Sequence, residues 1–175
     1  TASNGAVGLY HIENLTPEAV ELGEKLIAEG AKEYIIDDAE LERVQKNYPV
    51  IWKNPDATPK LCFVGCPHLS LEQLKTWTEN IEAELKKNGI KKVKIPTVFT
   101  AAPKVLEQFN QTEYAERLKA TGVITSYICP LMYMNNPLCK KMPVITSSNK
   151  LRTYTSARYY KDSEILTIIT DGGNK

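Results

Sequence analysis

The chain has 175 residues, of which 42% are hydrophobic and 25% charged, and its formal net charge is +1. This length can bury a sizeable core, and we expect one domain spanning residues 1–175. The near-neutral charge gives no reason to expect a nucleic acid or an anionic membrane surface as a partner, and the longest apolar stretches are too short to span a bilayer.

The first third of the sequence alternates between strand-like and helix-like patterns. Short apolar runs rich in aromatic and β-branched residues are typical of strands. A Thr-Pro pair ahead of a periodic apolar pattern is typical of a helix start, and a group of prolines predicts a loop. The expected elements are strands at 7–12 and 34–36, helices at 16–30 and 38–46, and a loop at 48–59.

The middle of the chain holds the clearest helix. It follows an apolar run at 60–64, which we interpret as a strand. Ser70 and Gln73 have the spacing of a capping box, and apolar residues then recur on one helical face until Gly89 ends the pattern. Further expected elements are strands at 93–99 and 123–128 and helices at 103–109 and 112–119.

The last part of the chain is predicted to contain a loop at 131–142, a strand at 143–146, a helical segment at 149–159 and a strand at 165–170. Strands that alternate with helices imply βαβ units and a mostly parallel sheet covered by helices on both faces. The expected fold class is therefore α/β with three layers. Because the chain starts at Thr1 and a strand-like run lies close to its end, we expect it to be part of a longer polypeptide.

Two cysteines follow predicted strands. Cys66 lies between the run at 60–64 and the capped helix, and Cys129 follows the run at 123–128; both precede a proline. Parallel strands bring such residues to one edge of the sheet, where ligands bind, and a thiol near a helix start favours the thiolate. Two thiolates at one edge are suited to share a metal or an iron–sulfur cluster. The alternative is that both are small buried hydrophobes.

The other two cysteines have no predicted role in a site. Cys62 lies inside a predicted strand and Cys139 in a predicted loop, and their spacing to the other cysteines is not typical of zinc. No secretory signal pattern accompanies the four cysteines, so we expect reduced thiols and a cytoplasmic protein.

His68 is a candidate catalytic residue because it lies two positions after Cys66. A histidine there is suited to donate a proton or to orient a substrate carboxylate. The alternative is a histidine that is hydrogen-bonded in a turn.

Polar residues also concentrate after the predicted strand at 143–146. Lys150 is a second catalytic candidate, and Ser148, Arg152 and Tyr154 are candidates to bind the carboxylate or phosphate of a substrate. Ser147 and Lys150 have the Ser-x-x-Lys spacing of serine acyl-enzymes. A strand-to-helix turn capped by Ser148 accounts for the same pattern, and the basic residues also suit a solvated helix face.

Four blocks of the sequence, 5–19, 65–74, 128–130 and 146–154, resemble the C-terminal part of the large catalytic subunit of the aconitase X family. The resemblance implies part of an iron–sulfur-dependent dehydratase that removes water from a small hydroxy acid; characterised branches act on phosphomevalonate or on a hydroxyproline isomer. By position, Cys66 and Cys129 match two of the three cluster ligands.

The resemblance also implies that parts of the active enzyme lie outside this chain. The third cluster ligand is expected in the N-terminal portion of the family, and a small swivelling subunit is expected as partner. The chain alone is therefore expected to be inactive and free of a cluster. The alternative is a non-catalytic α/β domain that binds a ligand or a partner and whose cysteines are structural.

Overall fold

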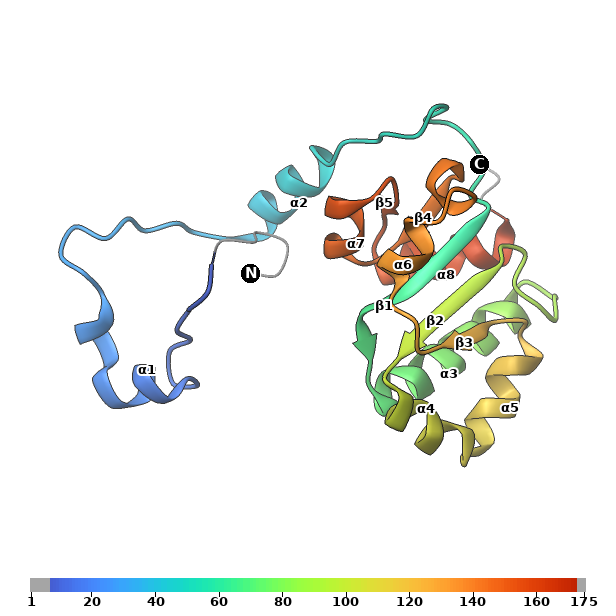
Figure 1. The fold of residues 1–175 in the computed structure, drawn as a ribbon, viewed down its shortest axis with the longest axis horizontal. Helices are drawn as coiled ribbons and strands as arrows, with labels where there is room; N and C mark the ends of the chain where they lie inside the picture. The colour runs from blue at the N-terminus through green and yellow to red at the C-terminus, as the bar shows by residue number, and fades with distance from the viewer. Residues whose placement is uncertain (1–6, 173–175) are drawn as a thin grey trace. The chain divides into compact units, whose positions relative to one another are not determined.

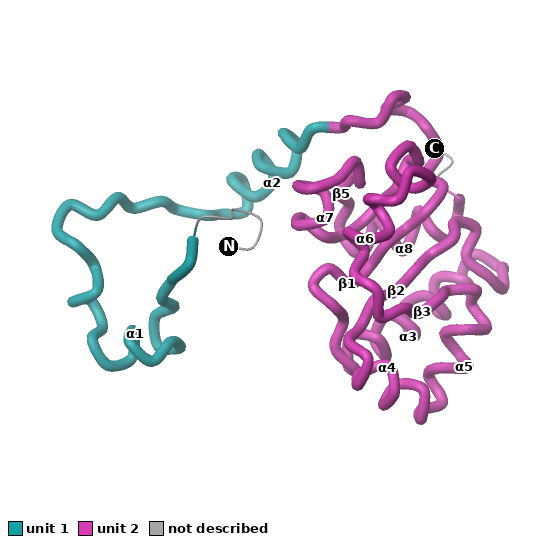
Figure 2. Tube along the Cα trace, viewed as in Figure 1, with its two compact units in different colours: residues 1–49 teal, residues 50–175 magenta. Residues whose placement is uncertain are grey.

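The computed structural model describes residues 7–172, and the chain divides into two units, Thr1–Pro49 and Val50–Lys175 (Figure 2). The described part of unit 1 contains α1 (Pro17–Leu22), the 3-10 turn η1 (Gly23–Leu26) and α2 (Asp38–Lys46). The predicted helix at 38–46 is confirmed, and the Asp37 side chain caps it by accepting from the Glu40 N–H at 2.8 Å. The helix predicted at 16–30 is shorter than expected and ends at Leu26.

The strands predicted at 7–12 and 34–36 are wrong for this structure, because neither stretch pairs with another strand in the described part of the chain. A strand needs a neighbour for its backbone N–H and C=O groups. The sequence pattern of these stretches carries no information about whether that neighbour is present.

Unit 2 holds the sheet and its covering helices. Its elements in chain order are β1 (Leu61–Leu69), α3 (Leu71–Lys87), β2 (Thr97–Ala101), α4 (Pro103–Asn110), α5 (Glu113–Ala120), β3 (Ile124–Ser126), α6 (Pro130–Met134), η2 (Cys139–Lys141), β4 (Val144–Thr146), α7 (Asn149–Tyr154), β5 (Arg158–Tyr159) and α8 (Asp162–Asp171).

The sheet has the order β3-β2-β1-β4-β5, and every pair is parallel. The chain begins in the centre with β1, moves outward to β3, and then returns to place β4 on the other side of β1. The strand order therefore reverses between β1 and β4. In open parallel sheets, ligands bind in the crevice at the carboxyl ends of the strands where this reversal occurs.

Two apolar cores lie on the two faces of the sheet, so the expected three-layer α/β fold is confirmed (Figure 1). Alternate residues of β1 point to opposite faces: Cys62 and Val64 pack with α3, α4, α5 and α8, whereas Phe63 packs with α6 and α7. Tyr133 of α6 stacks on Phe63 with ring centroids 5.4 Å apart.

The predicted capping box of α3 is confirmed. The Ser70 hydroxyl accepts from the Gln73 N–H at 3.2 Å, and the Gln73 side chain accepts from the Ser70 N–H at 2.9 Å. The buried face of α3 carries Trp77, whose ring meets Phe99 of β2 edge-on at 5.3 Å.

Three predictions near the end of the chain differ from the structure. The helical segment expected at 149–159 ends at Tyr154, and Arg158–Tyr159 form β5. The run 165–170, expected as a strand, lies within α8, where Ile165 and Ile169 are four residues apart and both fully buried on one helical face. A short apolar run fits either a strand or a buried helix. The loop expected at 131–142 contains most of α6 and all of η2. In the described part of the chain, no helix has the length and hydrophobicity needed to cross a membrane.

Candidate functional site

The junction between β1 and α3 departs from regular strand geometry at Gly65. Pairing of β1 with β2 is regular from Cys62 to Val64 and resumes only at Leu69, with a register shift between. Gly65 has φ +111°, and a Cβ atom built on it lies 2.3 Å from the Thr100 carbonyl oxygen. Only glycine fits this position, because it tolerates the positive φ and leaves room for the backbone of β2.

Thr100 of β2 fixes the same junction. Its side chain is fully buried, and its hydroxyl donates to the Gly65 carbonyl oxygen at 2.6 Å. The next peptide bond, between Cys66 and Pro67, is cis. The close contact and the hydrogen bond together set where the backbone of Cys66 leaves the sheet.

Cys66 lies in β1 just after its regular pairing with β2 stops, Cys129 follows β3 by three residues, and both cysteines are partly buried. Cys66 packs against the core shared by Phe63, Met134 and other residues on the α6–α7 face. Cys129 is the N-cap residue of α6, the helix that supplies Met134 to that core and contacts β1. Cys66 therefore adjoins the apolar cluster on this face of the sheet, and Cys129 begins the helix that packs on it.

A small hollow of about 170 Å³ opens at the point where the strand order reverses, between the ends of β1 and β4. It is lined by residues of β1, α3, the β4–α7 turn and the start of α8: Val64, Gly65, Cys66, Pro67, Leu69, Gln73, Trp77, Ser147, Ser148 and Asp162. The structure therefore brings Cys66 and Ser148 together, as two of the residues predicted from the sequence.

Ser148 is buried and has a defined hydrogen-bonding role. Its hydroxyl oxygen accepts from the Leu151 N–H at 3.0 Å and so caps α7, while its own N–H donates to the Thr146 hydroxyl oxygen at 3.1 Å. A hydroxyl that accepts one hydrogen bond still carries a proton to donate. Ser148 is therefore able to cap α7 and to contact a ligand in the hollow.

Asp162 is a site residue that sequence reasoning missed. It is the first residue of α8, and its exposed side chain lines the hollow beside Cys66. Asp162 was not predicted as a site residue because residues 165–170 were expected to form a strand, so no helix was expected to start at Asp162. The acidic residues Asp162 and Glu164 ahead of the apolar run were the available sign of a helix N-terminus.

The remaining predicted residues, Cys129 among them, are not part of the lining of the small hollow. His68 is exposed on the last part of β1, and Lys150 is partly buried near the start of α7. The Arg152 guanidinium donates to the Asn149 side chain at 2.9–3.0 Å. Tyr154, 52% exposed, lines a separate hollow of about 400 Å³ with the end of α6.

The thiols differ in their chemical environment. Burial raises the pKa of the Cys62 thiol well above its usual range, and a hydrogen bond with Thr97 offsets only part of that rise. Cys62 is fully buried in the sheet, as expected for a structural cysteine. Cys139 is partly buried in η2.

The donor set of this chain does not complete a metal site. Among residues 7–172, no group of three or more His, Cys, Asp or Glu side chains is arranged to hold a metal ion. Thiolates are the usual ligands of iron–sulfur clusters, and a cluster with three cysteine ligands at this edge would need a donor beyond Cys66 and Cys129.

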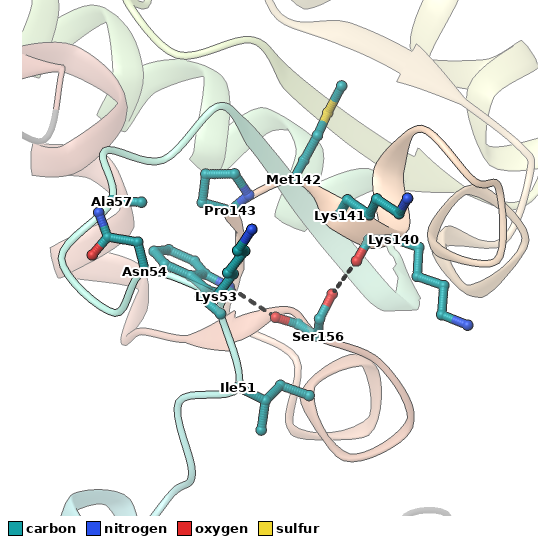
Figure 3. Close-up of a pocket in the computed structure, with 10 residues that line it drawn as sticks. Ile51, Lys53, Asn54, Ala57, Lys140, Lys141, Met142, Pro143 and Ser156 are labelled. Carbon is teal, nitrogen blue, oxygen red and sulfur yellow. Dashed lines mark hydrogen bonds between the residues drawn. The ribbon is translucent and has the colours of Figure 1, made fainter.

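A larger hollow of about 510 Å³ lies at the opposite edge of the sheet, at the amino ends of β1 and β4 (Figure 3). The Trp52 indole N–H donates to the Ser156 carbonyl oxygen at 2.8 Å, and the Ser156 hydroxyl donates to the Lys140 carbonyl oxygen at 3.1 Å. Three lysines, Lys53, Lys140 and Lys141, line this hollow without a carboxylate among its lining residues.

Known proteins share both sequence and fold with this chain. The family model of the aconitase X third domain matches residues 59–168. The phosphomevalonate dehydratase large subunit of Thermococcus kodakarensis is 30% identical over 118 residues, which cover 66% of this chain and 27% of that protein. The corresponding subunit of Methanosarcina mazei is 31% identical over 83 residues, covering 47% of this chain and 18% of that protein.

The crystal structure of the holo-form of Thermococcus kodakaraensis aconitase X superposes with a TM-score of 0.65 at 22% sequence identity, covering 98% of this chain and 42% of that chain. This likeness shows a shared fold. The chain spans about a quarter or less of the length of the curated relatives it matches. Because the family model covers more than half of its residues, the chain belongs to the aconitase X family.

Proposed function

We propose that the chain is part of an iron–sulfur-dependent dehydratase that removes water from a small hydroxy acid. The observation that carries this proposal is the position of Cys66, at the strand-order reversal of a sheet that matches the aconitase X third domain. The curated relatives are phosphomevalonate dehydratase large subunits, and a phosphorylated hydroxy acid is accordingly one candidate substrate.

Cys66 and Cys129 are proposed as two of three cluster ligands. Cys66 lies at the β1–α3 junction, Cys129 follows β3, and both Cys66 and the helix α6 that Cys129 begins pack on one apolar cluster; these positions support this role. When bound, a cluster with an open iron position would supply Lewis acidity to the hydroxyl that leaves. The third ligand is proposed to come from the portion of the large subunit that precedes the third domain.

The chain's own residues position the thiol and the substrate. Gly65 and Thr100 fix the backbone from which Cys66 projects. Ser148 is proposed to donate its hydroxyl proton to a substrate oxygen while it caps α7. Asp162 adds a carboxylate to the same hollow and is suited to accept a hydrogen bond from a substrate hydroxyl.

His68 and Lys150 are proposed as proton-transfer residues, and Arg152 and Tyr154 as contacts for the acidic end of the substrate. Elimination of water needs a base that removes a proton from the carbon next to the one that bears the hydroxyl. His68 is exposed and Lys150 is only partly buried, so these roles need a covering surface that excludes water. The small swivelling subunit is proposed to provide it, in keeping with the "large subunit" names of the relatives.

The proposal is tested by anaerobic reconstitution with iron and sulfide. The chain alone, with two of three ligands, is expected to form no stable cluster, read by visible absorbance. The complete large subunit with its small partner is expected to form one and to eliminate water from a hydroxy acid. A stoichiometric, stable cluster on the chain alone, or a complete enzyme that is active without iron, would contradict the proposal.

A second candidate function rests on the larger hollow. A non-catalytic ligand-binding domain would use the cationic pocket of Lys53, Lys140 and Lys141 and keep its cysteines as structural residues. Alkylation of the native chain separates the two. Ready labelling of Cys66 and Cys129 supports the dehydratase, whereas protection of both supports the binding domain.

A further inference from the structure

The described part of unit 1 exposes nearly all of its apolar side chains. Between residues 7 and 49, Ala19 is the only residue that is buried. Leu9, Leu15 and Ile27 are 67–71% exposed. Scattered exposed apolar residues are ordinary, but a stretch of chain whose apolar residues are almost all exposed marks an interaction surface.

Two stretches in this unit have the sequence of strands but no partner. In residues 32–36 no backbone N–H or C=O group forms a hydrogen bond with another described residue, and the same holds for residues 7–11. Figure 1 draws both as extended chain on either side of α1. Tyr34, Ile35 and Ile36 are 67–74% exposed.

The apolar pattern of residues 34–36 suits a strand with both faces covered. Successive side chains of a strand point to opposite faces, so Tyr34 and Ile36 would lie on one face and Ile35 on the other. Strands of parallel sheets are buried on both sides and read as continuous apolar runs. This stretch therefore fits an internal position in a parallel sheet better than an exposed edge.

The connection between the two stretches fits a parallel pair. Parallel neighbours need a crossover of a dozen or more residues, usually with a helix. The connecting segment, residues 12–31, has that length and contains α1 and η1. The order strand, helix, strand is therefore present in the sequence, and only the neighbouring strands are missing.

We infer that residues 7–11 and 32–36 are strands that pair with a sheet in the part of the aconitase X large subunit that precedes the third domain. The match to the third domain begins at residue 59, after both stretches, and the Thermococcus relative is nearly four times as long as the region matched, since that region covers 27% of it. This inference concerns assembly and does not depend on the dehydratase proposal.

A second copy of this chain fits the stretches less well. Two copies would bring together only four short strands, and each copy would supply only the six residues of α1 and the four of η1 as helical cover. A parallel sheet that is buried on both faces needs helices along both sides. We therefore expect further strands and most of the helical cover to come from a different polypeptide segment.

The test is amide hydrogen exchange measured by mass spectrometry. One sample is the chain alone, and the other is the chain joined behind the upstream portion of the Thermococcus kodakarensis large subunit. Amides of residues 7–11 and 32–36 are expected to exchange at least about 100-fold more slowly in the joined protein, while amides of α3 exchange equally in both. Exchange of the two stretches at equal rates in both samples would overturn the inference. So would protection in the isolated chain that grows with its concentration.

A pair of proline variants sharpens the test. Ile35→Pro removes a backbone N–H from the inferred strand and is expected to abolish the protection of residues 32–36 in the joined protein. Glu29→Pro is the control, since Glu29 is the second residue of the turn closed by the Ala31 N–H and the Ala28 carbonyl, where proline is tolerated. Equal protection in both variants would contradict the strand assignment.

Discussion

Gly65→Ala is the substitution that tests how the β1–α3 junction holds Cys66. The new Cβ atom meets the Thr100 carbonyl oxygen at 2.3 Å and its hydroxyl oxygen at 2.6 Å, and φ is +111°. The positive φ costs about 1–2 kcal/mol for a residue with a side chain, and forcing extra volume into a packed site costs about 1–3 kcal/mol. The free energy of unfolding is therefore expected to fall by about 2–5 kcal/mol.

Gly89→Ala is the matched control. Gly89 also has a positive φ, +66°, but a Cβ atom there meets nothing within 4 Å. The Gly89→Ala variant is expected to lose only the part of the free energy of unfolding that comes from the positive φ, about 1–2 kcal/mol. The difference between the two variants isolates the contact with Thr100.

The measurement is urea unfolding followed by tryptophan fluorescence, because both tryptophans, Trp52 and Trp77, lie in unit 2. In native Gly65→Ala, the alkylation rate of Cys66 is expected to change while that of Cys129 does not. A Gly65→Ala variant no less stable than Gly89→Ala would refute the reasoning.

Three further predictions concern the same sheet. Thr100→Val is expected to lower the free energy of unfolding by about 1–3 kcal/mol, because the Gly65 carbonyl loses its partner, whereas Thr100→Ser keeps the hydroxyl and most of that stability. Urea midpoints measure both variants, and equal losses would contradict the role of the hydrogen bond. Burial raises the pKa of Cys62 above its ordinary value of 9.0. As the pH rises above that value, the unfolded chain loses this proton before the folded chain does, so the free energy of unfolding is expected to fall. Cys62→Val should lessen this fall, and a pH profile of unfolding that is unchanged in this variant would contradict the prediction. Ser148→Ala is expected to cost about 1 kcal/mol through loss of the α7 cap, with Ser147→Ala as the control, and thermal unfolding that ranks the two variants in the reverse order would rule out this assignment.

Local patterns were enough to predict the elements whose stabilising contacts lie close in sequence. The capping box of Ser70 and Gln73 and the apolar face of α3 are read from a few neighbouring residues. The alternation of strands and helices also predicted the parallel sheet, and that sheet places Cys66 at the strand-order reversal.

The remaining features depend on contacts that are distant in sequence. The run 165–170 has the length and composition of a strand, and only packing of Ile165 and Ile169 against the sheet selects a helix. The fit of Gly65 against Thr100 depends on the register between β1 and β2. Tyr154 was grouped with Ser148 because the two are close in sequence, but they line different hollows.

The central claim is that Cys66 and Cys129 hold one cluster, and the most direct measurement of it is the iron content of the assembled enzyme. Cys66→Ala and Cys129→Ala are each expected to lose most of the bound iron, while Cys139→Ala keeps it at the level of the unaltered enzyme. Full iron content in both Cys66→Ala and Cys129→Ala would contradict the account.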